Sequence, residues 1–358
     1  MRVSSVLRAG RFLALAALAA CAEQPATSPS DGGAPANAMK SSGSEAAAVV
    51  GHPMLARINA RLARARSNVR VGKAELLYEA KAYNNAKTST EIFANDRTHT
   101  LPYEWVSGDP RRDGRIGVTY VVDPVLRTSA FGLNNLPAIE INGGGFRLST
   151  QAELDRYIEE GMQAWRDRRC ADAPIARVAV PAGTDPDLLD QLLLGFPPSP
   201  SYAQLADIVQ AGWQPPQFFE AYRPGASDAV LGVTFTFVFV DDQGTPDPSD
   251  DVNTDINGDG KLDIGLAEIY YNPTFIWTNR GAPNTIDFYS VITHETGHSL
   301  SLAHFGKVFV TKKAAADGIQ IADIKYAPKA LMNAVYVTGR DDIRGTDNGS
   351  FCQLWASK

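Results

Sequence analysis

The chain has 358 residues, a formal net charge of −6 and a pI of about 5.5, and it contains no block of basic residues. A chain with this charge has little attraction for a phosphate backbone, which excludes nucleic acid as an expected partner. Apolar residues make up 44% of the sequence. That fraction is typical of a packed soluble protein, and the length suits one large domain or two modest ones.

The N-terminus predicts export. A run of apolar residues at 12–20, too short to span a bilayer, follows three positive side chains, Arg2, Arg8 and Arg11. The run ends in Leu-Ala-Ala-Cys21, which resembles a bacterial lipobox. This resemblance implies that residues 1–20 are a lipoprotein signal peptide and that Cys21 is lipidated. Because Ala22 follows it, we expect an outer-membrane anchor facing the periplasm or the cell surface. An ordinary signal peptide cleaved nearby is the alternative.

Two regions of different composition follow. Residues 21–48 are rich in Ala, Ser, Pro and Gly, as a flexible tether is. Residues 49–106 predict a small α+β region whose role the sequence leaves open. Residues 52–67 predict a helix, because apolar residues recur at helical spacing, at Leu55, Ile58 and Leu62. Residues 69–83 and 90–93 have strand-like sequences.

A strand, a long helix and a second strand are expected next. Residues 116–122 alternate as a strand does. Thr150 and Glu153 form a capping box that begins a helix ending near Arg168, and the buried stripe of this helix is Leu154, Tyr157, Ile158 and Trp165. Residues 175–180 predict the second strand.

Residues 184–227 contain two proline-rich stretches and an amphipathic segment at 205–211. Four aromatic residues there are expected to cover the core rather than to form a platform for substrate: Trp213, Phe218, Phe219 and Tyr222. Residues 231–240 then predict a strong strand.

An acidic loop follows this strand. Oxygen-bearing side chains at alternating positions, with a glycine for the sharp turn, match the first half of an EF-hand calcium loop. The position of the loop's bidentate glutamate holds Leu266 instead. We therefore predict Ca²⁺ in a β-rich setting, with a solvated acidic turn as the alternative. The expected calcium residues are Asp255, Asn257, Asp259, Lys261, Asp263 and Glu268.

Three of the chain's five histidines fall within residues 294–304. On a helix His294 and His298 project from one face, because residues i and i+4 lie about 40° apart around the axis. Two imidazoles on one face form two-thirds of a catalytic zinc site, and Glu295 is placed to act as general base. His304 becomes the third ligand only if the chain turns sharply after Leu300, because an unbroken helix carries it about 240° away. Packing of histidines in the core is the alternative.

The motif HETGHSLSLAH resembles the zinc signature of the metzincin metallopeptidases, and its flanking residues resemble the matrixin branch. The flanking resemblance lies in Val291, Ile292, Thr293, Gly297, Ser299 and Leu300. This resemblance covers about residues 113–358. It implies an α+β, metzincin-like catalytic domain at 107–358, with an insertion at 184–227. Such a domain has a mixed twisted sheet, a long first helix, a zinc-site helix, a methionine turn (Met-turn) and a C-terminal helix.

The resemblance also assigns individual residues. Met332, in the sequence Ala-Leu-Met-Asn, is expected to form the Met-turn beneath the zinc, with ordinary core packing as the alternative. The family's glycine at the bend is Ser301 here. A bend of this kind needs a positive φ, which costs a residue other than glycine about 1 kcal/mol. Matrixin-like domains carry structural calcium before the zinc helix, which favours the calcium prediction.

Cys170 and Cys352 are the cysteines that remain beside Cys21. In an oxidising compartment we expect them to form a disulfide that ties the start of the fold to its last helix. The alternative comes from the resemblance to matrixin zymogens, in which a cysteine outside the mature domain caps the zinc. In that interpretation the capping residue is Cys170.

The function that the resemblance implies is that of a Zn²⁺-dependent endopeptidase, which acts on a protein or peptide substrate through a metal-bound water activated by Glu295. Two other functions stay open. One is a non-catalytic, calcium-stabilised surface lipoprotein with a structural zinc, and the other is a zinc hydrolase of a non-peptide amide. A structural zinc needs a fourth protein ligand, and the sequence near the motif holds no spare His or Cys, which leaves an Asp or a Tyr.

Overall fold

The structure is a computed structural model, and it describes residues 52–79, 100–123, 136–141, 145–171, 173–182, 184, 186–194, 205–279, 285–310, 324–336 and 342–356. The predicted signal peptide, Cys21, the tether and the expected strand at 90–93 lie outside these ranges. None of the described helices combines the length and the apolar character that crossing a lipid bilayer requires.

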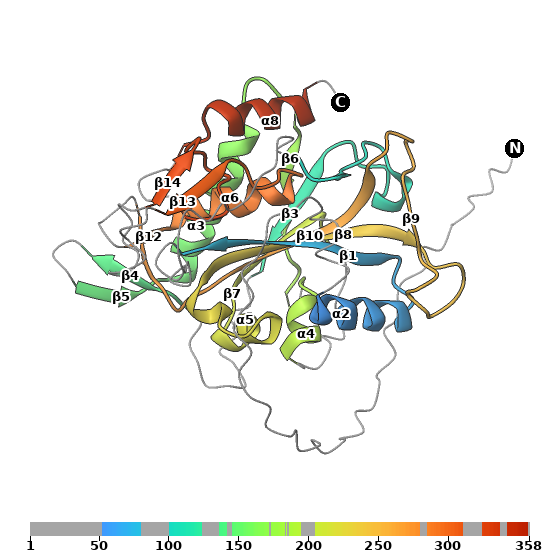
Figure 1. Cartoon of the computed structure of the whole chain (residues 1–358), viewed down its shortest axis with the longest axis horizontal. Helices are drawn as coiled ribbons and strands as arrows, with labels where there is room; N and C mark the ends of the chain where they lie inside the picture. The colour runs from blue at the N-terminus through green and yellow to red at the C-terminus, as the bar shows by residue number, and fades with distance from the viewer. Residues whose placement is uncertain are drawn as a thin grey trace, which may run out of the picture.

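A mixed sheet of eight strands forms the centre of the molecule (Figure 1). In sheet order its main strands are β1 Val69–Tyr78, β8 Val230–Asp241, β10 Leu262–Tyr271, β7 Ile208–Trp213, β3 Val118–Val122 and β6 Ile175–Arg177. Two short strands extend it, β2 Tyr103–Glu104 beside β10 and β9 Val252–Asn253 beside β8. β8 runs antiparallel to both β1 and β10, whereas β10, β7, β3 and β6 pair in parallel.

Two smaller sheets lie outside the central one. The first contains β12 Ile286–Asp287, β11 Ile276–Thr278, β4 Ala138–Ile141 and β5 Gly145–Leu148. The second contains β13 Lys307–Val310 and β14 Ile324–Ala327.

Helices cover both faces of the central sheet (Figure 1). One face packs against α3 Gln151–Arg166, α6 Phe288–Ser299 and α8 Gly345–Trp355. The other face packs against α2 Pro53–Arg64, α4 Leu189–Leu194 and α5 Pro216–Tyr222. Two 3₁₀ turns, η2 Pro110–Arg112 and η3 Ala226–Asp228, complete the described helical elements. The α+β class with a mixed sheet is therefore confirmed.

The predicted long helix forms as α3 because its first turn is capped on both sides. The Thr150 hydroxyl accepts from the Glu153 amide, and the Glu153 carboxylate accepts from the Thr150 amide. The predicted apolar stripe is buried, at Leu154, Tyr157, Ile158 and Trp165. Trp165 also donates from its indole to the main-chain carbonyl of Thr293, at 2.8 Å, which fixes α3 against α6.

The amphipathic segment predicted at 205–211 is corrected by the structure. It leads into β7, a central strand with β10 on one side and β3 on the other. A short parallel strand is buried on both faces, so its residues lack the alternation that identifies a half-exposed strand. The expectation for the aromatic residues is confirmed, because all four are buried, at Trp213, Phe218, Phe219 and Tyr222.

Residues 52–79 are not separate from the rest of the fold. β1 pairs with β8 along almost its whole length, from Val69 opposite Phe239 to Tyr78 opposite Val230. α2 packs beneath the same sheet through its buried Leu55, Ile58 and Leu62. The region whose role the sequence left open thus supplies one edge of the central sheet.

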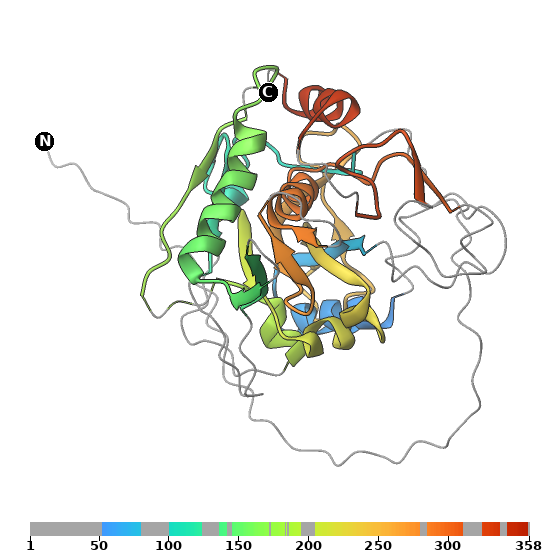
Figure 2. The same ribbon diagram turned by 90° about the vertical axis from the view of Figure 1, so that its left-hand side faces the viewer.

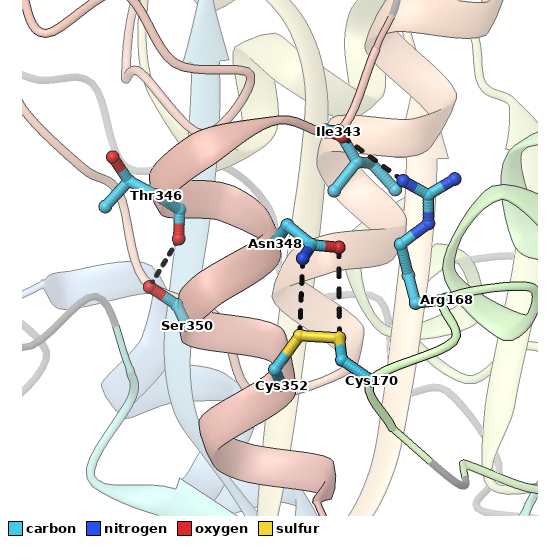
Figure 3. The surroundings of a disulfide bond; sticks show 7 residues. All are labelled: Arg168, Cys170, Ile343, Thr346, Asn348, Ser350 and Cys352. Carbon is cyan, nitrogen blue, oxygen red and sulfur yellow. Dashed lines mark hydrogen bonds between the residues drawn. A yellow bond between two sulfur atoms is a disulfide. The ribbon is translucent and has the colours of Figure 1, made fainter.

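The predicted disulfide between Cys170 and Cys352 is present, with Cα atoms 5.3 Å apart (Figure 3). It joins the segment after α3 to α8, where the Asn348 side-chain amide donates to the Cys352 sulfur at 3.4 Å. Arg168 adds a hydrogen bond from its guanidinium to the Ile343 carbonyl at 3.2 Å. A cysteine held in this way does not cap a metal site.

Candidate metal centre

Helix α6 places two of the predicted ligands side by side. Its first turn is capped by Asp287, whose carboxylate accepts from the amide and the hydroxyl of Ser290, each at 2.7 Å. His294 and His298 follow on one face, and their Nε2 atoms lie 3.0 Å apart. Both side chains are buried.

The chain turns after Leu300 and brings His304 back to this pair, as the spacing requires. The Ser301 amide donates to the His298 carbonyl and the Leu302 amide to the Gly297 carbonyl, each at 3.0 Å, which is a Schellman ending. Ser301 has φ of 75°, the left-handed conformation predicted for this bend. The His304 ring centre then lies 4.5 Å from that of His298 and 5.4 Å from that of His294.

We expect the substitution Ser301→Gly to stabilise the protein by about 1 kcal/mol, because glycine adopts positive φ without steric cost. The buried Ser301 hydroxyl, which has no hydrogen-bond partner, would also be removed. Ser299→Gly is the matched control. Ser299 ends α6 with a hydroxyl bonded to the Thr296 carbonyl at 2.8 Å, so glycine there should destabilise by about 1 kcal/mol. Urea unfolding measures both, and a loss of stability in Ser301→Gly would contradict the strain at this bend.

Each imidazole is held from its outer side by an oxygen atom. The Nδ1 atom of His294 contacts the Leu331 carbonyl at 2.7 Å, and that of His298 contacts the Leu302 carbonyl at 2.8 Å. The Nδ1 atom of His304 lies 3.1 Å from a carboxylate oxygen of Glu75. These contacts set the tautomer, because Nδ1 must carry the proton that it donates. All three Nε2 atoms are therefore left with free lone pairs.

These three residues fit a zinc ion. Among the described residues they are the one group of three or more His, Cys, Asp or Glu side chains with ligand atoms within 4.8 Å of one another. His304 Nε2 is buried and has no hydrogen-bond partner. Burial and the neighbouring imidazoles lower the pKa of His294 well below its usual range and that of His298 to about 3, so both stay neutral at pH 7. Neutral imidazoles with converging lone pairs are the donors that Zn²⁺ binds.

Glu295 lies between α6 and β8 with its carboxylate fully buried. The Thr234 hydroxyl donates to its Oε2 at 2.6 Å, whereas its Oε1 is buried without a hydrogen-bond partner. A Cβ atom on Gly232 would lie 2.9 Å from that Oε1. Any larger residue at position 232 would therefore clash with the carboxylate. Burial raises the pKa of Glu295 well above its usual range, against the Thr234 hydrogen bond, which lowers it.

Met332 packs against α6 at Gly297. Its sulfur would be 2.6 Å from a Cβ on Gly297, so the glycine in the motif permits this close approach. The turn that carries it also supplies the Leu331 carbonyl to His294. Asp347 on α8 fixes the turn by accepting from the amides of Leu331, at 2.9 Å, and Met332, at 3.1 Å.

Glu75 is the residue of the site that the sequence interpretation missed. It lies on β1 and is buried, with Oε1 2.6 Å from the Lys73 ammonium and Oε2 on His304. Burial alone would raise its pKa, but Lys73 and His304 hold the pKa of Glu75 well below the usual range. The available signal was the charged residues Lys73 and Glu75, which together with Arg70 lie in a strand whose other buried side chains are apolar.

The acidic loop does not bring all six predicted calcium residues together. Asp255 accepts main-chain hydrogen bonds from Gly258, Asp259 and Gly260, and the Asn257 amide donates to Glu104 at 2.6 Å. Lys261 forms an ion pair with Glu104 at 3.2 Å.

Asp263 lies near this loop because it accepts from the Ile256 amide, but it also binds the Arg111 guanidinium. Glu268 lies about 16 Å further along β10, since each strand residue spans about 3.3 Å. Its carboxylate binds the amides of Leu188 and Leu189. Glu268 is therefore not a ligand of the loop, and calcium at the other residues stays a prediction.

No protein-family model matches this chain, and no curated protein matches it either.

The hydrogen bond from His304 to Glu75 gives a testable effect on zinc affinity. We expect the double variant Lys73→Met/Glu75→Leu to bind zinc about 10- to 100-fold more weakly than Lys73→Met/Glu75→Gln. Both variants lack the buried lysine charge, and they differ only in whether residue 75 can accept a hydrogen bond from His304. Competition with a chromophoric chelator measures the two affinities. Equal affinities would mean that Glu75 does not hold His304 in its ligating orientation.

Proposed function

We propose that this chain is a zinc-dependent endopeptidase of the metzincin type, related to the matrixin branch. The support is the HExxHxxxxxH motif on α6, the left-handed bend at Ser301, the Met332 turn and the mixed sheet with its long helix α3. His294, His298 and His304 would hold the zinc, and Glu295 would be the general base.

One observation carries this proposal. Glu295 directly follows His294 on α6, its carboxylate is fully buried, and one of its oxygens has no hydrogen-bond partner. An unsatisfied buried carboxylate oxygen costs folding free energy, so a protein that needed zinc only for structure would gain by replacing it. A proton acceptor for catalysis needs such a free oxygen.

In this proposal the two carboxylate oxygens of Glu295 have different roles. Thr234 holds Oε2, which orients the carboxylate and leaves Oε1 to accept a proton from the attacking water. The same carboxyl group then delivers that proton to the nitrogen of the leaving amine. Burial raises the pKa of Glu295, which makes its carboxylate a stronger proton acceptor than an exposed glutamate. Bound zinc would supply Lewis acidity, which polarises the substrate carbonyl.

A second candidate has an observation in its favour. The three histidines and Glu295 are all buried, which leaves the site little access to solvent or to a substrate. A zinc centre closed in this way is typical of structural sites. This candidate is the non-catalytic lipoprotein with a structural zinc.

Hydrolysis of a quenched peptide library by the zinc-loaded, delipidated protein separates the two candidates. We expect cleavage that a chelator abolishes and added zinc restores, and N-terminal sequencing of the fragments would give the cleavage preference. Stoichiometric zinc with no hydrolysis under any condition that exposes the site would favour the structural candidate.

The remaining proposals rest on the sequence alone. We propose that the chain is exported, that Cys21 carries a lipid anchor for the outer membrane, and that its substrate is a protein or peptide. Structural calcium in the acidic loop is proposed on the same basis.

A further inference from the structure

Strand β1 crosses the zinc centre. In the register of β1 with β8, Glu75 lies opposite Thr234 and Leu77 lies opposite Gly232. Thr234 and Gly232 are the two β8 residues that contact the Glu295 carboxylate. Figure 2 shows β1, in blue, passing close to α6, in orange, and the two elements are in contact.

The side of β1 that faces α6 touches the site directly. Residues directly opposite in an antiparallel pair project to the same face, so Glu75 and Leu77 point with Thr234 and Gly232 towards α6. Glu75 binds His304, and the Leu77 amide lies near enough to Glu295 to lower its pKa. Leu76 points to the other face, into the cluster that contains Val233.

This strand closes the site. Glu295 and His298 have no exposed surface, and His304 retains 7%. β8 has β10 on one edge and β1 on the other, so its hydrogen-bonding edges are both paired along the stretch beside Glu295. A peptide that must bring its carbonyl to Glu295 has no strand edge to bind while β1 is in place.

β1 buries charged side chains, which a strand that only packs against the core does not need. It is the terminal strand of the main path of the sheet, and it buries Arg70, Lys73 and Glu75. Buried ion pairs contribute little to stability compared with apolar side chains of the same size, because both charges lose their hydration. Glu75 instead contacts His304, one of the proposed zinc ligands.

We propose that β1 occupies the place of an extended peptide substrate on β8, so that the chain as folded is a closed form that opens when β1 leaves this edge. The inference rests on the proposed function, and it adds that residues 69–78 compete with substrate for the edge of β8 within the same molecule.

A cross-link between β1 and β8 tests this proposal. Leu76 and Val233 are directly opposite and face away from the zinc centre, so the double variant Leu76→Cys/Val233→Cys can form a disulfide without touching the site. The probe is a peptide hydroxamate, whose binding to the zinc-loaded full chain is measured by calorimetry in the oxidised and the reduced state. The matched control is Ala138→Cys/Leu148→Cys, a directly opposite pair in the β4–β5 hairpin.

We expect the oxidised β1–β8 variant to bind the hydroxamate at least about 100-fold more weakly than its reduced form, because locking removes the open population. The reduced variant should bind like the wild type under the same reductant, and the control pair should show no difference between its two states. Equal binding in both states of the β1–β8 variant, or no binding in either, would overturn the proposal.

Hydrolysis measured in the same samples separates this inference from the proposed function. Hydroxamate binding that depends on unlocking, without hydrolysis in any sample, supports the closing role of β1 and contradicts the peptidase. Hydrolysis that is equally fast in the oxidised and reduced states supports the peptidase and contradicts the closing role of β1.

Discussion

Replacing Glu295 by glutamine is expected to lower kcat about 100- to 10,000-fold while the zinc content stays at that of the wild type. Glutamine has the size of glutamate and can still accept the Thr234 hydrogen bond on its carbonyl oxygen. It cannot accept a proton from water near neutral pH. The change therefore removes the proposed base without removing a proposed ligand or opening a cavity.

The measurement is hydrolysis of a quenched peptide by both proteins side by side, with zinc determined by mass spectrometry. Thr234→Val is a companion variant that keeps the carboxylate but removes the hydroxyl on Oε2. We expect it to lose less activity than Glu295→Gln, because its carboxylate remains a base with a less fixed orientation. Full activity in Glu295→Gln would remove this residue from the mechanism.

Replacing His304 by alanine is expected to weaken zinc binding by at least about 100-fold, because the site keeps two of its three imidazoles. The variant should lose hydrolysis at zinc concentrations that saturate the wild type. His304 lies in the segment after the bend and not on α6, so the helix that holds His294 and His298 should remain folded.

His52→Ala is the matched control for the loss of a histidine. His52 lies before α2, where its ring stacks on Tyr222 with ring centres 4.5 Å apart. Its removal should leave zinc affinity unchanged. Equilibrium dialysis measures zinc affinity in both variants, and a His304→Ala protein that binds zinc like the wild type would show that this imidazole is not a ligand.

The sequence was sufficient for the local part of the site. The i, i+4 spacing places His294 and His298 on one helix face, and the need for a bend before His304 follows from helix geometry alone. The positive φ at Ser301 and the capped start of α3 are local as well, since each depends on a few consecutive residues. Local signals of this kind are read directly from the order of residues.

The contribution of β1 could not be predicted because it depends on a long-range pairing. A strand-like pattern at 69–78 shows that a strand forms but does not show which strand it joins. Only the register of β1 with β8 brings Glu75 to His304, and only that pairing covers Glu295. β7 was missed for a related reason. A strand that lies between β3 and β10 is buried on both faces, so its sequence does not alternate between apolar and polar residues.

X-ray absorption at the zinc edge of the purified full chain identifies the atoms that bind zinc. We expect one zinc per chain with three imidazole nitrogens at about 2.0–2.1 Å, and a signal from only two in the His304→Ala protein. Zinc bound through sulfur, or a wild-type chain that binds no zinc while remaining folded, would contradict this expectation.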